Sequence, residues 1–177
     1  MATLGRLSTG ASSQNIGDSF RVTEIGTMTE DGTLDSIHFD IAYNDGFNGG
    51  PRFALYKGSI GALTLVADVG QIGSSTGTVS ASAAGESLTN GDTLFAAFKH
   101  DRTFGIGYNF DVGVSGDSYT FADGDADHDP TATPPASITA SGTASTAQPA
   151  AAYITYTATT AGSTLGGLVG SNTGLIG

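Results

Sequence analysis

Cysteine and tryptophan are both absent from this chain of 177 residues. Without cysteine the chain has no disulfides and no thiolate metal ligands. No stretch approaches the roughly 20 apolar residues of a membrane-spanning helix. The first ten residues also contain no apolar run long enough for a signal peptide. We therefore expect no membrane segment and no export by a cleaved signal.

Positive charge is scarce, with six Lys and Arg against seventeen Asp and Glu, for a net charge of −11. A chain of this sign repels phosphate backbones, so we expect no direct nucleic-acid binding. Charged residues make up only 13% of the chain, roughly half the usual share. This low density predicts that neighbouring protein covers much of the surface. The alternative is a β protein of small residues that carries few charges for other reasons.

Helical periodicity is missing too, because no window repeats its apolar residues every 3.6 positions. Residues 36–43 and 104–112 instead alternate apolar and polar side chains, as half-buried strands do. In the second run Gly105 and Gly107 lie opposite the aromatics, which predicts close approach of a neighbouring backbone. Residues 99–102 are expected to form a charged corner. Eight to ten short strands are expected, at residues 18–27, 36–43, 52–58, 63–72, 93–99, 104–112, 118–121, 137–141 and 153–157, while residues 76–83 are small and weakly patterned.

This pattern of short strands and turns predicts an all-β chain that forms a two-sheet antiparallel β-sandwich. The domain boundaries follow from composition. Residues 1–17 are expected to form an extended N-terminal arm, residues 18–158 the sandwich, and residues 159–177 a Gly-rich apolar C-terminal arm.

Four aspartates alternate in one Gly-containing loop, and spaced carboxylates of this kind suit a hard cation such as Ca²⁺. They are Asp123, Asp125, Asp127 and Asp129. No glutamate completes an EF-hand set, so a solvated acidic loop without metal is the alternative. No other cofactor is expected.

Catalytic motifs are absent, since no Gly-Xaa-Ser-Xaa-Gly lies between a strand and a helix. We therefore expect no enzyme activity, and His38 is expected to be a surface residue on the polar face of its strand. Aromatic side chains that could stack on sugars alternate mostly as core residues do, so a glycan ligand is a secondary hypothesis. These aromatics are Tyr43, Phe47, Tyr56, Tyr108 and Tyr119.

The end of the chain has no Asp, Glu, Lys, Arg or His after Asp129, yet it keeps several large apolar residues. We expect this tail to add an extended segment to the sheet edge or groove of a neighbouring subunit. The alternative is that it folds back on its own domain. The predicted interface residues are Leu165, Leu168, Val169, Leu175 and Ile176.

Several short motifs occur along the chain in the order GASS (10–13), EIGT (24–27), RFALYKG (52–58), LTLVADVG (63–70), LTNGDTLFAAF (88–98), YTFADG (119–124) and AYITYT (152–157). Together they resemble a jelly-roll-like β-sandwich module of tailed-phage virion proteins. The resemblance covers about residues 10–158 and implies a jelly-roll-like sandwich with a structural or adhesive role.

The resemblance and the uncharged tail together predict a capsid decoration or cement protein. Its partners would be further copies of itself, as a trimer, and the major capsid protein or other virion subunits. It would be made in the host cytoplasm and lie on the capsid surface of the virion. A tail or fibre component that binds a receptor or carbohydrate is the alternative, and a secreted hydrolase or its accessory module is a third hypothesis.

Overall fold

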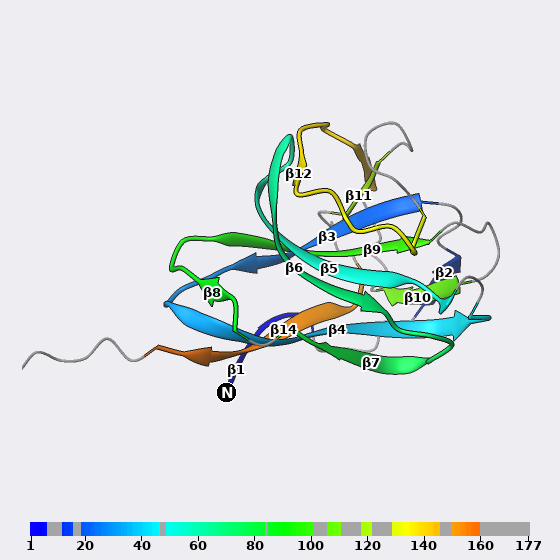
Figure 1. The fold of residues 1–177 in the computed structure, drawn as a ribbon, viewed down its shortest axis with the longest axis horizontal. Coiled ribbons are helices and arrows are strands. Elements are labelled where there is room, and N and C mark those ends of the chain that lie inside the picture. The colour runs from blue at the N-terminus through cyan, green and yellow to red at the C-terminus, as the bar shows by residue number, and fades with distance from the viewer. Residues whose placement is uncertain are drawn as a thin grey trace, which may run out of the picture.

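A computed structural model describes residues 1–6, 12–15, 19–46, 49–83, 85–100, 106–110, 118–121, 129–145 and 150–159. These residues form two antiparallel sheets, one of them strongly curled, so the predicted all-β sandwich is confirmed (Figure 1). Within these ranges no helix is long and apolar enough to cross a membrane.

The first sheet is built around β4, the longest strand, which pairs with other strands along both edges. On one edge lie β14 and β10, each paired in turn with an N-terminal strand, β1 or β2. On the other edge lie β7 and β8. The strands are β1 (Ala2–Gly5), β2 (Ser12–Asn15), β4 (Gly32–Asn44), β7 (Gly77–Ser82), β8 (Ser87–Leu88), β10 (Ile106–Phe110) and β14 (Ala152–Ala158).

The second sheet runs in the order β12-β6-β5-β9-β3-β11-β13. Its two outermost strands, β12 and β13, are separated by only four residues in the chain. The sheet therefore curls until its ends nearly meet, and a single segment spans the gap. The strands are β3 (Ser19–Thr27), β5 (Arg52–Ser59), β6 (Ala62–Gln71), β9 (Thr93–His100), β11 (Ser118–Phe121), β12 (Ser137–Ile138) and β13 (Thr143–Ser145).

The curl gives the molecule two cores. The first lies between the sheets, where Phe39 of β4 packs against Phe53 and Phe98 of the second sheet. The second lies inside the curled sheet, where Phe20 makes edge-to-face contacts with Tyr56 and Phe121. Strands β3, β5 and β9 separate the two cores and contribute side chains to both.

The segment that closes the curled sheet is held by backbone groups as well as apolar side chains. The Tyr56 hydroxyl donates to the Pro135 carbonyl at 2.7 Å, and the Leu65 amide donates to the Ala136 carbonyl at 2.9 Å. Gly142 has φ of +62°, and an added Cβ would lie 3.0 Å from the Phe121 ring. A glycine is therefore required where the chain turns beneath that ring.

The predicted apolar alternation along β4 is confirmed for Ile37, Phe39 and Ile41, which enter the first core, but Tyr43, expected on the same side, is exposed. The close approach expected at Gly107 is also found, but the neighbour is a side chain. The ring of Tyr43 lies against Gly107, where a Cβ would overlap it. The missing side chain of Gly107 thus makes room for an aromatic from the paired strand.

Two local expectations differ from the structure. In the stretch expected to form an N-terminal arm, residues 2–5 and 12–15 are strands of the first sheet. Lys99 and His100, expected in a charged corner, are the last residues of β9 and are buried. Both differences have the same cause, which is backbone pairing of residues whose side chains show no apolar pattern. Strand β1 pairs with β14, β2 pairs with β10, and the end of β9 pairs with β3.

Candidate functional site

The outer face of the first sheet is a regular surface made by several paired strands. It is formed by the residues of β1, β4, β7 and β14 that alternate with core residues. Its exposed positions carry hydroxyls on Thr3, Thr78, Ser80, Ser82 and Thr157. The face is therefore rich in hydrogen-bonding groups but presents little charge to solvent.

The centre of this face is an aromatic pair. The rings of His38 and Tyr153 stack with centroids 4.2 Å apart and planes 3° from parallel. Ser36 lies beside the pair, with its hydroxyl 2.7 Å from His38 Nε2 and 2.6 Å from the Thr155 hydroxyl. Burial lowers the pKa of His38, so the imidazole is neutral at pH 7. His38 is on the polar face as predicted, but it is half-buried and ordered by its neighbours.

The Ser36–His38 contact has the length of a nucleophile–base hydrogen bond, so its wider geometry matters. A working serine nucleophile also needs a group that orients the histidine and donors that stabilise an oxyanion. Among the residues described here, the polar and ring contacts of His38 are with Ser36 and Tyr153. Ser36 also shares its hydroxyl with Thr155. Within the described residues, the arrangement is therefore a chain of hydrogen bonds from Thr155 through Ser36 to His38, with Tyr153 stacked on the imidazole.

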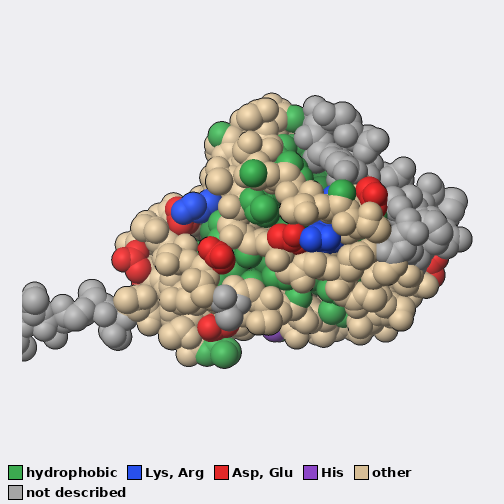
Figure 2. All heavy atoms as spheres, in the orientation of Figure 1, with side chains coloured by type: hydrophobic (Ala, Val, Ile, Leu, Met, Phe, Trp, Pro, Cys, Tyr) green, Lys and Arg blue, Asp and Glu red, His purple; other side chains and the backbone are tan. Residues whose placement is uncertain are grey.

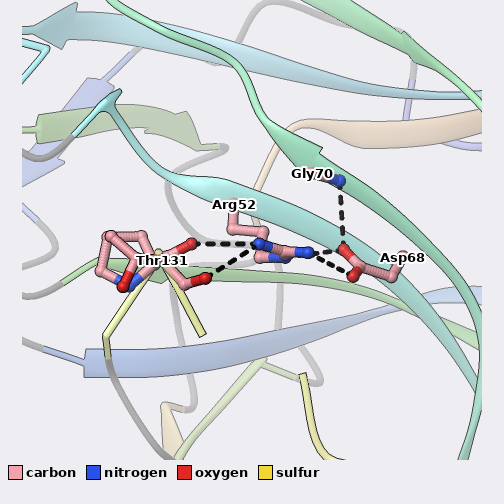
Figure 3. A network of polar contacts seen from close by, with 5 residues as sticks. Arg52, Asp68, Gly70 and Thr131 are labelled. Atoms are coloured by element: carbon pink, nitrogen blue, oxygen red, sulfur yellow. Dashed lines mark hydrogen bonds and ion pairs between the residues drawn. The ribbon is translucent and has the colours of Figure 1, made fainter. Parts of the chain in front are cut away.

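A second polar cluster lies on the curled sheet (Figure 3). Arg52 binds Asp68 in a two-pronged ion pair, with Nε to Oδ1 at 2.8 Å and Nη2 to Oδ2 at 2.5 Å. Arg52 Nη1 also reaches the carbonyls of Pro130 and Thr131, both at 3.4 Å. The cluster fastens the start of the closing segment to β5 and β6, which is a structural role.

Within this cluster, burial favours the protonated form of Asp68. This effect of burial is outweighed by hydrogen bonds from Arg52 and the Gly70 amide and by the positive charges of Arg52 and Lys99. The net result is that the pKa of Asp68 is lowered. The carboxylate is therefore charged at neutral pH, as the ion pair requires.

Only one member of the predicted acidic metal loop lies in the described residues. Asp129 Oδ1 accepts hydrogen bonds from the Thr131 amide and hydroxyl, at 2.8 and 2.7 Å. These bonds, with a smaller effect from Lys99, lower the pKa of Asp129. Asp123, Asp125 and Asp127 lie outside the described residues, within which no three metal-ligating side chains cluster. The Ca²⁺ site stays a prediction.

The aromatic residues considered for sugar stacking differ in how exposed they are in the structure. Tyr56 is fully buried in the second core and cannot reach a ligand. Tyr43 is 39% exposed and Tyr119 half-buried, while Phe47 and the Tyr108 side chain fall outside the described part. Tyr153 was expected only as part of the closing strand, yet it forms the aromatic centre of the outer face. Its place beside His38 depends on strand pairing between residues 115 positions apart, which local sequence does not reveal.

The predicted tail interface, Leu165, Leu168, Val169, Leu175 and Ile176, lies outside the described residues, which end at Thr159. Its role stays a prediction.

Comparison of the chain with protein-family models, with curated proteins and with solved structures gave no match. The resemblance to virion modules therefore rests on the quoted motifs alone.

Proposed function

We propose that this protein is a non-enzymatic structural subunit that binds neighbouring protein, as a capsid decoration or cement protein of a tailed-phage virion. The outer face of the first sheet carries the proposal. Contact surfaces between proteins are depleted of charge at their centres and enriched in aromatic residues. This face combines exposed hydroxyls with the stacked Tyr153–His38 pair.

The distribution of acidic side chains supports this use of the face. The exposed acids Glu30, Asp31, Asp45 and Glu86 lie in turns between strands. On the face itself, Asp40 is buried and Asp35 is half-buried, with its carboxylate accepting from Thr157. A partner docked on the sheet would therefore displace little charge-bound water, which keeps its desolvation cost low.

The uncharged tail supplies the second predicted contact. We propose that residues 161–177 bridge to an adjacent subunit through Leu165, Leu168, Val169, Leu175 and Ile176, and that copies associate around threefold sites of the shell. Deleting residues 161–177 should leave the two sheets folded, because the described strands end at Ala158. The deletion should nevertheless abolish incorporation into particles.

The test of the proposal is cosedimentation of the purified chain with emptied tailed-phage capsids. Thr3→Glu places a charge on the outer face and should weaken capsid binding. Thr64→Glu changes an exposed threonine of β6 in the other sheet, and serves as the matched control. Equal binding by both variants, or no binding by the unmodified chain, would contradict the proposal.

A second candidate function is carbohydrate binding in a tail or fibre. It is favoured by Tyr153, because tyrosine rings stack on sugars and the hydrogen-bonded hydroxyls of Ser36 and Thr155 lie on the same face of the sheet. Gly5, the cross-strand partner of Tyr153 on β1, has no side chain beside the ring. Glycan-array binding that is lost in Tyr153→Ala and kept in Tyr43→Ala, without capsid affinity, would favour this alternative.

A further inference from the structure

The outer edge of the first sheet at β7 is open within the described part of the chain. Strand β7 pairs on one side only, with β4. Sheet edges that natural proteins keep unpaired are usually protected by charge, proline, a bulge or very short length. Strand β7 spans six residues, has no charged residue or proline, and pairs with β4 in unbroken register. It therefore lacks these protections.

Hydrogen-bond directions show which backbone groups face this open edge. The Ala83 amide donates to the Asp35 carbonyl, while the Asp40 amide donates to Ala151 on the opposite side of β4. Odd-numbered residues of β4 therefore bond toward β7, and their partners in β7 are odd-numbered too. It follows that Thr78, Ser80 and Ser82 direct their amides and carbonyls away from β4, toward the free edge.

The apolar side of the same edge is also incompletely covered. Val79 and Ala81 pair with Phe39 and Ile37 and pack on the first core, but both remain partly exposed. Figure 2, in the orientation of Figure 1, shows hydrophobic side chains at the surface in the region between β6 and β7. The partly buried apolar residues there, on β6 and β7 and just after each, are Val66, Val69, Ile72, Val79, Ala81 and Ala83.

We propose that β7 is the interaction surface for a second copy of this chain, which pairs its own β7 antiparallel across a twofold axis. A second copy fits this edge because the strand is self-complementary in an antiparallel pairing, which brings apolar side chains together on one face and hydroxyls together on the other. Each copy carries a net charge of −11, which opposes self-association, so a contact between two copies has to lie on an uncharged element. Residues 77–83 are such an element.

The register of the pairing follows from which side chains share a face. Opposed residues in an antiparallel pair lie on the same side of the sheet. Centring the twofold axis on Ser80 places Val79 opposite Ala81 of the second copy, and Thr78 opposite its Ser82. Apolar side chains then meet on the core side, and hydroxyls meet on the outer side. This register also uses the free backbone groups of all three outward-directed residues.

The proposal goes beyond capsid decoration, because it concerns association of free chains in solution. The experiment is sedimentation velocity of the full chain over a wide concentration range. We expect a concentration-dependent monomer–dimer equilibrium. Ser80→Lys places two like charges opposite each other and should raise the dimer dissociation constant at least tenfold. Thr3→Lys adds the same charge to an exposed hydroxyl position on β1, and should change it less than twofold.

Cross-linking gives a second measurement that does not depend on the lysine variant folding. Because the chain has no cysteine, Ser80→Cys introduces a single thiol that lies next to its symmetry mate in the proposed dimer. A short bis-maleimide should convert Ser80→Cys to covalent dimer and leave Thr3→Cys monomeric.

Four results would overturn the proposal. They are a monomer at every concentration, equal behaviour of the two lysine variants, equal cross-linking of the two cysteine variants, and association that disappears only when residues 161–177 are deleted. The last result would make the tail the occupant. Failure to bind capsids would contradict the proposed function while leaving this dimer intact.

Discussion

Replacing Phe20 by alanine tests whether the curled sheet has a core that matters as much as the one between the sheets. The Phe20 side chain is 1% exposed and contacts the rings of Tyr56 and Phe121, with centroids 6.0 and 6.1 Å away. Truncating a buried phenylalanine to alanine costs about 3–5 kcal/mol. Each edge-to-face contact contributes about 0.5–1.5 kcal/mol beyond burial. We therefore expect Phe20→Ala to lower the free energy of unfolding by about 4 kcal/mol.

The comparison variant is Phe39→Ala in the core between the sheets. Phe39 is equally buried and also contacts two phenylalanine rings, so it is a matched truncation. Strand β9 sends Leu94, Ala96 and Phe98 to the first core, and Phe95 and Ala97 to the second. Because such strands serve both cores, neither core can melt alone. We expect one cooperative transition in both variants.

The assay is equilibrium urea unfolding followed by far-UV circular dichroism, since the chain has no tryptophan. The predicted loss corresponds to a fall in Tm of roughly 8–16 °C for a domain of this size. A loss below about 1.5 kcal/mol would show that the curled sheet's interior is loosely packed. A separate early transition in Phe20→Ala alone would show that the second core unfolds independently. Either result would refute the reasoning.

Three further predictions concern single polar groups. Because the pKa of Asp68 is lowered in the folded state, its contribution to stability is present above the unfolded pKa of about 3.9 and is lost as pH falls through the folded value. Arg52→Ala should lower the free energy of unfolding by roughly 1–3 kcal/mol at pH 7. It should also flatten the dependence of stability on acid pH in urea titrations, and an unchanged pH dependence would contradict the ion pair's role. Tyr56→Phe removes the hydrogen bond to Pro135 and should cost about 1 kcal/mol, whereas a neutral result in urea unfolding would mean that the bond adds nothing. The lowered pKa of His38 predicts that its imidazole signal in NMR titrates with a midpoint below pH 6.5. The signal is assigned by its absence in His38→Gln, and a midpoint above 6.5 would show that the ring is not desolvated.

Much of the strand pattern could be predicted because alternation records burial directly. Along β4, Ile37, Phe39 and Ile41 alternate with Ser36, His38 and Asp40, and the structure places the first set in the core. Strands β3, β5, β6 and β9 begin and end within a residue or so of their predicted bounds. These strands are flanked by turn residues and carry large apolar side chains, so local sequence determines them.

The remaining features depend on pairing between distant parts of the chain. Strands β1, β2 and β13 contain mostly small residues. They are extended because they pair with strands that lie elsewhere in the sequence. Curling of the second sheet depends on residues 137–145 pairing at one end with β6 and at the other with β11. No local pattern encodes that double attachment. The Tyr153–His38 pair at the candidate site was missed for the same reason.

The two sheets differ in what they offer to a neighbouring molecule. The second sheet brings its edge strands β12 and β13 close together through one short connection, and these two strands have only two and three residues. The first sheet ends in the four-residue strands β1 and β2 on one side. On the other side it ends in β7, which has six residues and no charge. In the proposed dimer this uncharged strand of the first sheet supplies the junction. Its hydroxyl-rich outer face would then become continuous across the two copies, doubling the surface available to a shared partner.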